Sequence, residues 1–182
     1  EGKKNVNEIK TFPAPSVLGE IKENTTVTTN NLNQLSKEKI INQAIKFHLE
    51  GNLSEATKYY QYFINQGFTD YRVFLNYGVI LKSLGKLQEA ELSLRKAIEI
   101  NPHYADAHSS LGTILRDLGK LKEAELLQRK AIELNPNFAN AYSNLGYILK
   151  GLGKLKEAEI STRKAIELNP SFANAYDNLG NI

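Results

Sequence analysis

The sequence predicts an all-α solenoid, a stack of helical hairpins, on three observations. Small residues recur every 34 positions, as in the series Gly78, Gly112 and Gly146. The octet LGKLKEAE occurs at 118–125 and again at 152–159, and LGKLQEAE occurs at 84–91. Each repeated unit contains two stretches whose apolar residues have helical spacing. A fixed period of this size is typical of repeat architectures, in which each unit buries its apolar side against its neighbours.

Each unit is expected to contain two helices with defined ends. Residues 71–84 form the first apolar-periodic stretch, and Gly85 follows as a residue able to take the positive φ of a helix stop. Residues 87–100 form the second stretch. It should end at Asn101-Pro102, because the residue before a proline avoids helical geometry.

Small residues at fixed places predict close contact between the helices. Gly112 in a first helix and Ala124 in the second would let the two axes approach, and Ala131 would do the same against the next unit. Glu125 and Arg129 stand four residues apart with the acid first, the favourable order on an exposed helix face. The 34-residue unit therefore has a packing explanation.

This pattern resembles the tetratricopeptide repeat, a 34-residue helix–turn–helix unit, over residues 71–182. In the unit that starts at Ala139, the residues that match the family's pattern are Tyr142, Leu145, Gly146, Leu149, Ala158, Ala165 and Pro170. The array is similar to those of cyanobacterial and other bacterial proteins, and to the repeat arm of protein O-linked N-acetylglucosamine transferases. The resemblance implies a right-handed superhelical solenoid whose first helices line a concave face.

The resemblance and the composition together divide the chain. Residues 1–36 lack a helical period and are expected to be extended or disordered; the alternative is that 11–21 docks into a groove. The expected units are a divergent first repeat at 37–70, repeats at 71–104, 105–138 and 139–172, and the first helix of a truncated further repeat at 173–182. In that last helix Tyr176, Leu179 and Ile182 are expected to face water, and self-association through it is predicted.

Two departures from the repeat pattern carry expectations of their own. In 37–70, Phe63 and Phe68 replace a small residue and a proline, and this aromatic hairpin is expected to pack on Tyr71, Phe74 and Tyr77. Position 24 of the unit, often aromatic in the family, is Leu94, then Gln128, then Thr162. This series predicts a more hydrated outer face.

Composition excludes several classes of function. The chain has no cysteine, so it has neither disulfides nor thiolate metal sites. A net charge of +3, spread among acids and bases, argues against nucleic-acid binding, and no apolar run approaches the roughly 18 residues of a membrane span. Of three histidines, His108 takes a packing position of the repeat. We therefore expect no enzyme, no metal or other cofactor, and a cytoplasmic protein, bacterial in origin.

The candidate binding residues follow from the resemblance, which places certain first-helix positions on the concave face. Position 6 reads Asn76, Ser110, Asn144 and Asn178; position 12 reads Lys82, Arg116 and Lys150; position 2 adds Asn140 and Asn174. An amide both donates and accepts, so it can match a peptide group without reading its side chain. The alternative is that asparagine is merely tolerated at a solvated position.

The sequence therefore predicts a non-catalytic scaffold that binds a protein or an extended peptide on its concave face. A second hypothesis is a substrate-presenting arm of a larger enzyme, such as a glycosyltransferase. A spacer function is a third, and RNA binding is disfavoured by the small charge.

Overall fold

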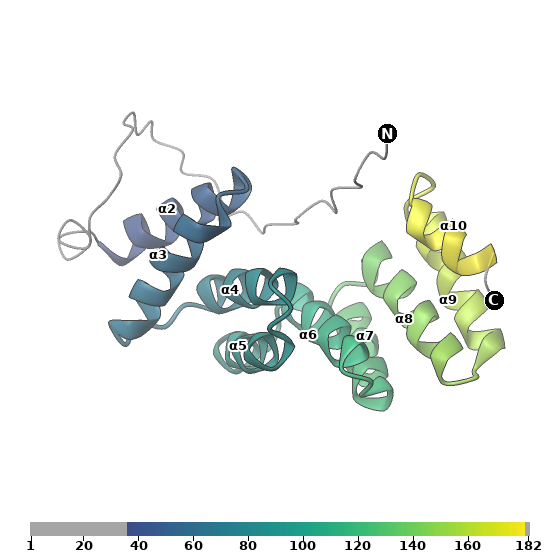
Figure 1. The fold of residues 1–182 in the computed structure, drawn as a ribbon. Helices are drawn as coiled ribbons and strands as arrows, with labels where there is room; N and C mark the ends of the chain where they lie inside the picture. Colours follow the sequence, from purple (N-terminus) through teal and green to yellow (C-terminus); the bar gives the residue numbers. More distant parts are fainter. Residues whose placement is uncertain (1–35, 181–182) are drawn as a thin grey trace.

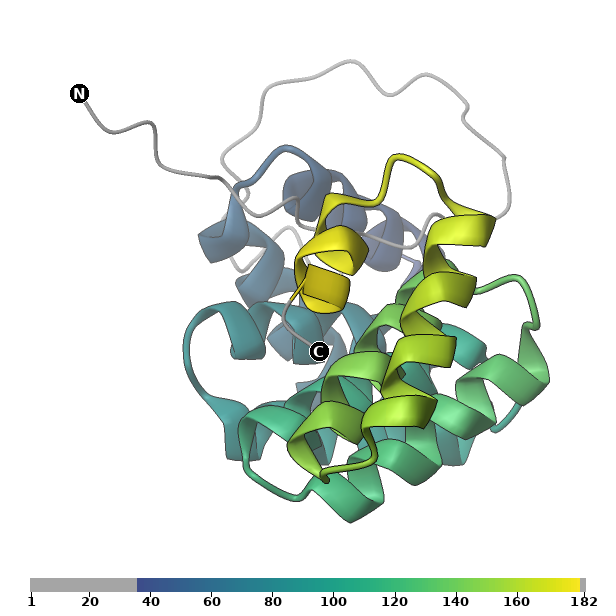
Figure 2. The ribbon, with the colours of Figure 1, turned by 90° about the vertical axis from the view of Figure 1, so that its right-hand side faces the viewer.

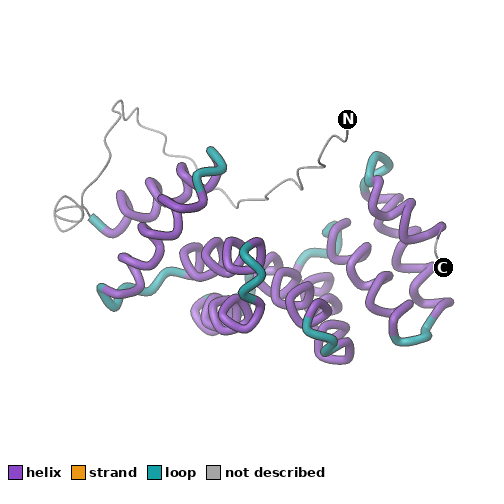
Figure 3. The backbone as a smooth tube through the Cα atoms, viewed as in Figure 1, coloured by secondary structure: helices purple, strands orange, loops and turns teal. Residues whose placement is uncertain are grey.

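The computed structural model describes residues 36–180, and within this range it contains helices and loops and no strand. The helices are α2 (Lys37–Leu49), α3 (Leu53–Asn65), α4 (Tyr71–Ser83), α5 (Leu87–Ile100), α6 (Ala105–Asp117), α7 (Leu121–Leu134), α8 (Ala139–Gly151), α9 (Leu155–Leu168) and α10 (Ala173–Gly180). The expected all-α solenoid is confirmed (Figure 3). The expectations for the N-terminal segment, for docking of 11–21 and for Ile182 lie outside the described residues.

The helices are paired in chain order, and the pairs follow one another along an arc (Figure 1). The first helices α4, α6 and α8 lie on the inner side of this arc, and Figure 2 shows the stack from its α9–α10 end. Successive first helices contact one another directly, whereas successive second helices are farther apart. The array bends because its inner layer is packed more closely than its outer one.

The turn within each pair depends on a glycine, as at Gly119. Its φ of +76° lies in the left-handed region, which residues with a Cβ rarely adopt. This conformation lets the Gly119 N–H donate to the Arg116 carbonyl (2.9 Å) and the Lys120 N–H to the Leu115 carbonyl (2.8 Å). The last carbonyls of α6 are thereby satisfied, and α7 can start at once.

The connection between units is made by Asn-Pro. At the end of α7, Asn135 has an extended backbone, with φ of −139° and ψ of +91°. Its side-chain oxygen accepts a hydrogen bond from the Asn137 N–H at 3.2 Å, which closes a short turn before α8. The second helix therefore ends where the sequence predicts.

Glycine is also required where the two helices of a pair cross. A Cβ placed on Gly146 would meet Thr162 Oγ1 and would lie 3.1 Å from the Ala158 carbonyl oxygen. At Gly78 the added Cβ would lie 2.8 Å from Leu94 Cγ. The predicted close approach of the helices is therefore present in the fold.

The residues at position 24 of the repeat are buried away from water, so the expectation of a more hydrated outer face is wrong. Leu94, Gln128 and Thr162 are all fully buried. Gln128 Nε2 donates to the Ser109 carbonyl at 2.9 Å, and its Oε1 accepts from Ser109 Oγ at 3.0 Å. Thr162 donates to the Ala158 carbonyl at 2.8 Å. Internal hydrogen bonds replace water, so these polar side chains can be buried.

The first pair, α2–α3, has its own aromatic core. Tyr60 and Phe63 are buried there, and the Tyr60 ring lies 6.4 Å from the Tyr77 ring of α4, as expected. Tyr71 differs from the expectation, because its ring packs edge-to-face on Tyr104 of the following unit at 4.9 Å. The aromatic hairpin therefore contacts α4 through part of the expected surface.

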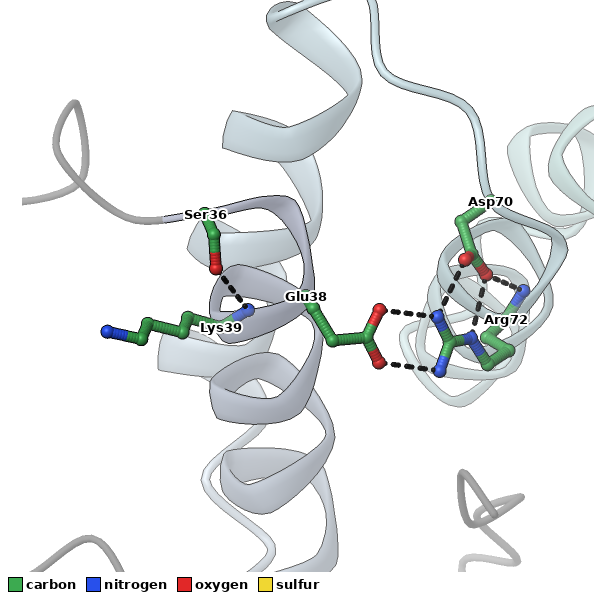
Figure 4. A network of polar contacts seen from close by, with 5 residues as sticks. All are labelled: Ser36, Glu38, Lys39, Asp70 and Arg72. Carbon is green, nitrogen blue, oxygen red and sulfur yellow. Dashed lines mark hydrogen bonds and ion pairs between the residues drawn. The ribbon is translucent and has the colours of Figure 1, made fainter. Parts of the chain in front are cut away.

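An arginine joins α2 to the start of α4 (Figure 4). Arg72 donates to both carboxylate oxygens of Glu38 at 3.0 Å and to Asp70 at 2.8 Å. These hydrogen bonds, that to Asp70 first, raise the pKa of the Arg72 guanidinium. Because Asp70 also accepts from the Arg72 backbone N–H, one carboxylate both caps α4 and orients the arginine.

Candidate peptide-binding face

Two amides on the inner helices are held in a defined orientation. Asn144 Nδ2 donates to Thr113 Oγ1 at 3.4 Å, and that hydroxyl itself donates to the Ser109 carbonyl. Asn178 Nδ2 donates to the Ser143 carbonyl at 3.3 Å and to Ser143 Oγ at 3.1 Å. In both cases the partner must accept, so the NH₂ group is fixed and the amide oxygen remains available as an acceptor.

Asn76 occupies the same repeat position but is fully buried, and within residues 36–180 neither of its amide atoms has a hydrogen-bond partner. The first-unit residues that correspond to Ser143 and Thr113 are Ile41 and Ile45, which cannot accept a hydrogen bond. In this conformation Asn76 is out of reach of a guest. The accessible part of the series therefore comprises Ser110, Asn144 and Asn178, all half-buried.

The cations at position 12 differ in how they are paired. Lys82 Nζ lies 3.5 Å from Asp117, and Arg116 donates to the same carboxylate at 2.6 Å. Lys150 is exposed and makes no ion pair with the residues that the structure describes. Near α4 and α6 one carboxylate therefore offsets one of the two cations, and Lys150 adds a further positive charge at the end of α8.

An aromatic side chain extends this surface. The Arg116 guanidinium lies 5.0 Å from the centre of the Tyr147 ring, and Tyr147 is 51% exposed. Stacked arginine and tyrosine side chains offer a flat surface to an apolar or planar group. The arrangement brings together residues of α6 and α8, two successive first helices.

Sequence reasoning missed Asp117 and Tyr147 as site residues. Both stand at positions that the resemblance places on the inner face, but neither belongs to a series that repeats from unit to unit. The fact that these two residues differ from those at the same positions of the other units could have identified them as candidate site residues. Of the remaining predicted residues, Asn140 is half-buried and Asn174 is exposed at the start of α10.

Among the described residues, the histidines make packing contacts or lie on the surface. His108 is buried, as predicted for a packing residue, and a ring nitrogen lies 2.8 Å from the Pro102 carbonyl oxygen. Tyr176, which holds the same position two repeats later, makes the equivalent contact and donates to the Pro170 carbonyl at 3.2 Å. Within 36–180 no cluster of His, Asp and Glu side chains could hold a metal ion.

A search of residues 36–180 for a helix with the length and hydrophobicity of a membrane span finds none.

Solved structures with the same architecture are numerous. MamA aligns at a TM-score of 0.68 and 25% identity, over 75% of this chain and 80% of its own. YrrB, a TPR protein with an unusual peptide-binding site, aligns at 0.70 and 22% identity, over 78% and 73%. The first TPR of Spaghetti (RPAP3), bound to the HSP90 peptide SRMEEVD, aligns at 0.59 and 26%, over 61% and 88%. No curated protein matches the sequence.

Family models give the most direct comparison. One described as TPR repeat matches residues 78–115 and 112–153, and another described as tetratricopeptide repeat matches 139–172. The matches together run from 78 to 172, more than half of the chain. The chain belongs to the tetratricopeptide repeat family.

Proposed function

We propose that this protein is a non-catalytic scaffold that binds an extended segment of a partner protein on the inner face of α6, α8 and α10. The observation that carries the proposal is the fixed orientation of Asn144 and Asn178. Each amide donates to the preceding first helix, which leaves its oxygen to accept a backbone N–H of a guest. The Spaghetti domain that this chain is similar to is itself bound to a peptide, which supports this class of ligand.

The remaining residues of the face would shape the preference for a guest. Amide oxygens recognise the peptide backbone, whereas the Arg116–Tyr147 stack would contact an apolar or aromatic side chain. Lys150 would favour an acidic residue of the guest near the end of α8. Because Lys82 and Arg116 share Asp117, they together offer an acidic peptide about one net positive charge rather than two.

A random peptide library displayed on phage and selected against the full chain tests the proposal. The best binders are then measured by calorimetry against Asn144→Ala/Asn178→Ala. Two lost hydrogen bonds, each worth roughly 1 kcal/mol, should weaken binding about thirtyfold.

The matched control is Asn137→Ala, an exposed asparagine in the loop between α7 and α8, which should bind as the wild type does. Selected peptides whose affinity is the same for the double variant and for the wild type would remove the amides from the site. Failure to select any peptide would remove the inner face as a binding surface.

A further inference from the structure

The spacing of the two oriented amides limits which conformation a guest can have. Asn144 and Asn178 occupy the same position of successive units, so their side chains are separated by about the distance between two stacked first helices. Helices α8 and α10 contact each other directly, and Asn178 Nδ2 reaches Ser143 Oγ at 3.1 Å. Helices in direct contact have their axes about 8–10 Å apart. A guest that donates to both amide oxygens must therefore present two backbone N–H groups on one side at about this distance.

The regular conformations of a peptide differ in this distance. Within an α-helical guest the N–H groups are already bonded to the helix's own carbonyls. In a β-strand the N–H groups on one side recur every second residue, which places them about 6.6 Å or about 13 Å apart. A polyproline II helix has three residues per turn and makes no internal hydrogen bonds, and its equivalent N–H groups lie about 9.3 Å apart. Among these conformations, polyproline II matches the spacing of the amides.

An exposed aromatic ring beside Asn144 favours the same conformation. Tyr147 follows Asn144 by three residues, so the two side chains are neighbours on one face of α8. The Tyr147 ring is 51% exposed, and the Arg116 guanidinium of α6 lies 5.0 Å from its centre. Proline-rich segments in the polyproline II conformation bind to surfaces lined by aromatic side chains. The inner face thus combines an aromatic ring with two acceptors that are one three-residue turn apart.

We propose that the inner face of α8 and α10 selects a proline-rich segment in the polyproline II conformation whose non-proline residues recur every third position. The inference rests on the proposed function and specifies the guest. The N–H of one residue would donate to the Asn144 oxygen, and the N–H of a residue three positions away would donate to the Asn178 oxygen. Neither of these residues can be proline, which has no N–H, whereas a proline between them would pack on Tyr147.

Two peptides of identical composition test the three-residue spacing. In PPSPPSPPSPPS serine recurs every third position, so two serine N–H groups can reach both amides at once. In PPSPSPSPSPPP no two serines lie three residues apart, so in the polyproline II conformation this peptide can satisfy only one of the two amides. Both peptides have blocked ends and the same fluorophore. Fluorescence anisotropy measures their binding to the full chain.

The wild type should bind the first peptide about fivefold more tightly than the second, since one hydrogen bond distinguishes them. Asn144→Ala removes the middle acceptor of the series Ser110, Asn144 and Asn178, so no two acceptors remain one unit apart and the two peptides should bind equally. Tyr147→Ala should weaken both peptides by a similar factor and keep the preference. The matched control Asn137→Ala should behave as the wild type does.

Three results would overturn the proposal. A preference for the second peptide would indicate a β-strand guest, whose N–H groups on one side recur every second residue. Equal binding to the wild type, or a preference that persists in Asn144→Ala, would show that the spacing of the amides does not select the guest. Absence of binding by both peptides at millimolar concentration would exclude a proline-rich guest.

These results are distinguishable from failure of the proposed function. Peptides selected from the random library that lose affinity in Asn144→Ala/Asn178→Ala would keep the inner face as a binding surface, even if neither proline-rich peptide binds. In that case only the conformation assigned to the guest would be wrong.

Discussion

The protein should become less stable as the pH is lowered, because of one buried histidine. His48 of α2 is 1% exposed, and its ring contacts Tyr60 edge-to-face at 6.3 Å. Neither of its nitrogens has a hydrogen-bond partner in the part of the chain that the structure describes. Burial lowers the pKa of His48 from 6.5 to about 4, because a charged ring would lose its hydration. Lowering the pH from about 7.5 to about 5 should protonate His48 in the unfolded chain and leave it neutral in the folded protein.

The sign and size follow from linkage. The folded-state pKa of His48 is depressed, so its contribution is complete above pH 6.5 and is lost progressively as the pH falls towards 4. Each unit between the two pKa values corresponds to about 1.4 kcal/mol. At about pH 5 the free energy of unfolding should be lower by about 2 kcal/mol.

Urea unfolding followed by far-ultraviolet circular dichroism measures this change. Because a terminal unit can unfold before the rest of an array, hydrogen exchange of α2 and α3 amides provides a local measurement. His48→Phe keeps an aromatic ring beside Tyr60 and should lose most of the dependence on pH above 5. An unchanged free energy of unfolding between the two pH values in the wild type, or the same loss in His48→Phe, would refute the reasoning.

Three further predictions concern packing and charge. Gly146→Ala should lower the free energy of unfolding by about 1–3 kcal/mol, because its Cβ would press on Thr162 and Ala158; Gly180→Ala, with nothing within 4 Å, should lower it little or not at all. Ser109→Ala removes the donor to the buried Gln128 oxygen and should cost about 1–3 kcal/mol in thermal or urea unfolding. Adding Gln128→Leu should recover most of that loss, since Leu94 fills the same place one unit earlier; no recovery would contradict the account. Glu91 and Glu125 have lowered pKa values, chiefly because Lys120 and Lys154 donate hydrogen bonds to them, so their contribution is complete above about pH 4.5 and is lost below it. Glu91→Gln/Glu125→Gln should therefore show a shallower loss of stability in acid titrations than the wild type.

The sequence alone was sufficient for the repeated features of this protein. The first helices of the pairs start at 37, 71, 105, 139 and 173, and Asn-Pro precedes the last three of these starts. A glycine that takes positive φ recurs at the turn within each of the four pairs from α2–α3 to α8–α9. A small residue is needed at Gly146 because the two helices of its own unit cross there. His108 packs inside the array because it stands at a packing position of the repeat. Such features depend on contacts within one unit, which a period of 34 residues repeats in full.

Tertiary structure decided the features that depend on a neighbouring unit. Asn76 and Asn144 have the same residue type at the same position, yet one is buried without a partner and the other is held by Thr113. Gln128 can be buried because Ser109 lies opposite it and forms a hydrogen bond with it. Asp117 pairs with two cations, and the sequence shows those cations only as members of a repeated series. Burial, pairing and accessibility are properties of what lies across an interface between helices. A residue type that recurs every 34 positions therefore predicts the local helical structure. Whether its side chain can bind a ligand depends on the residue that lies opposite it in the neighbouring helix.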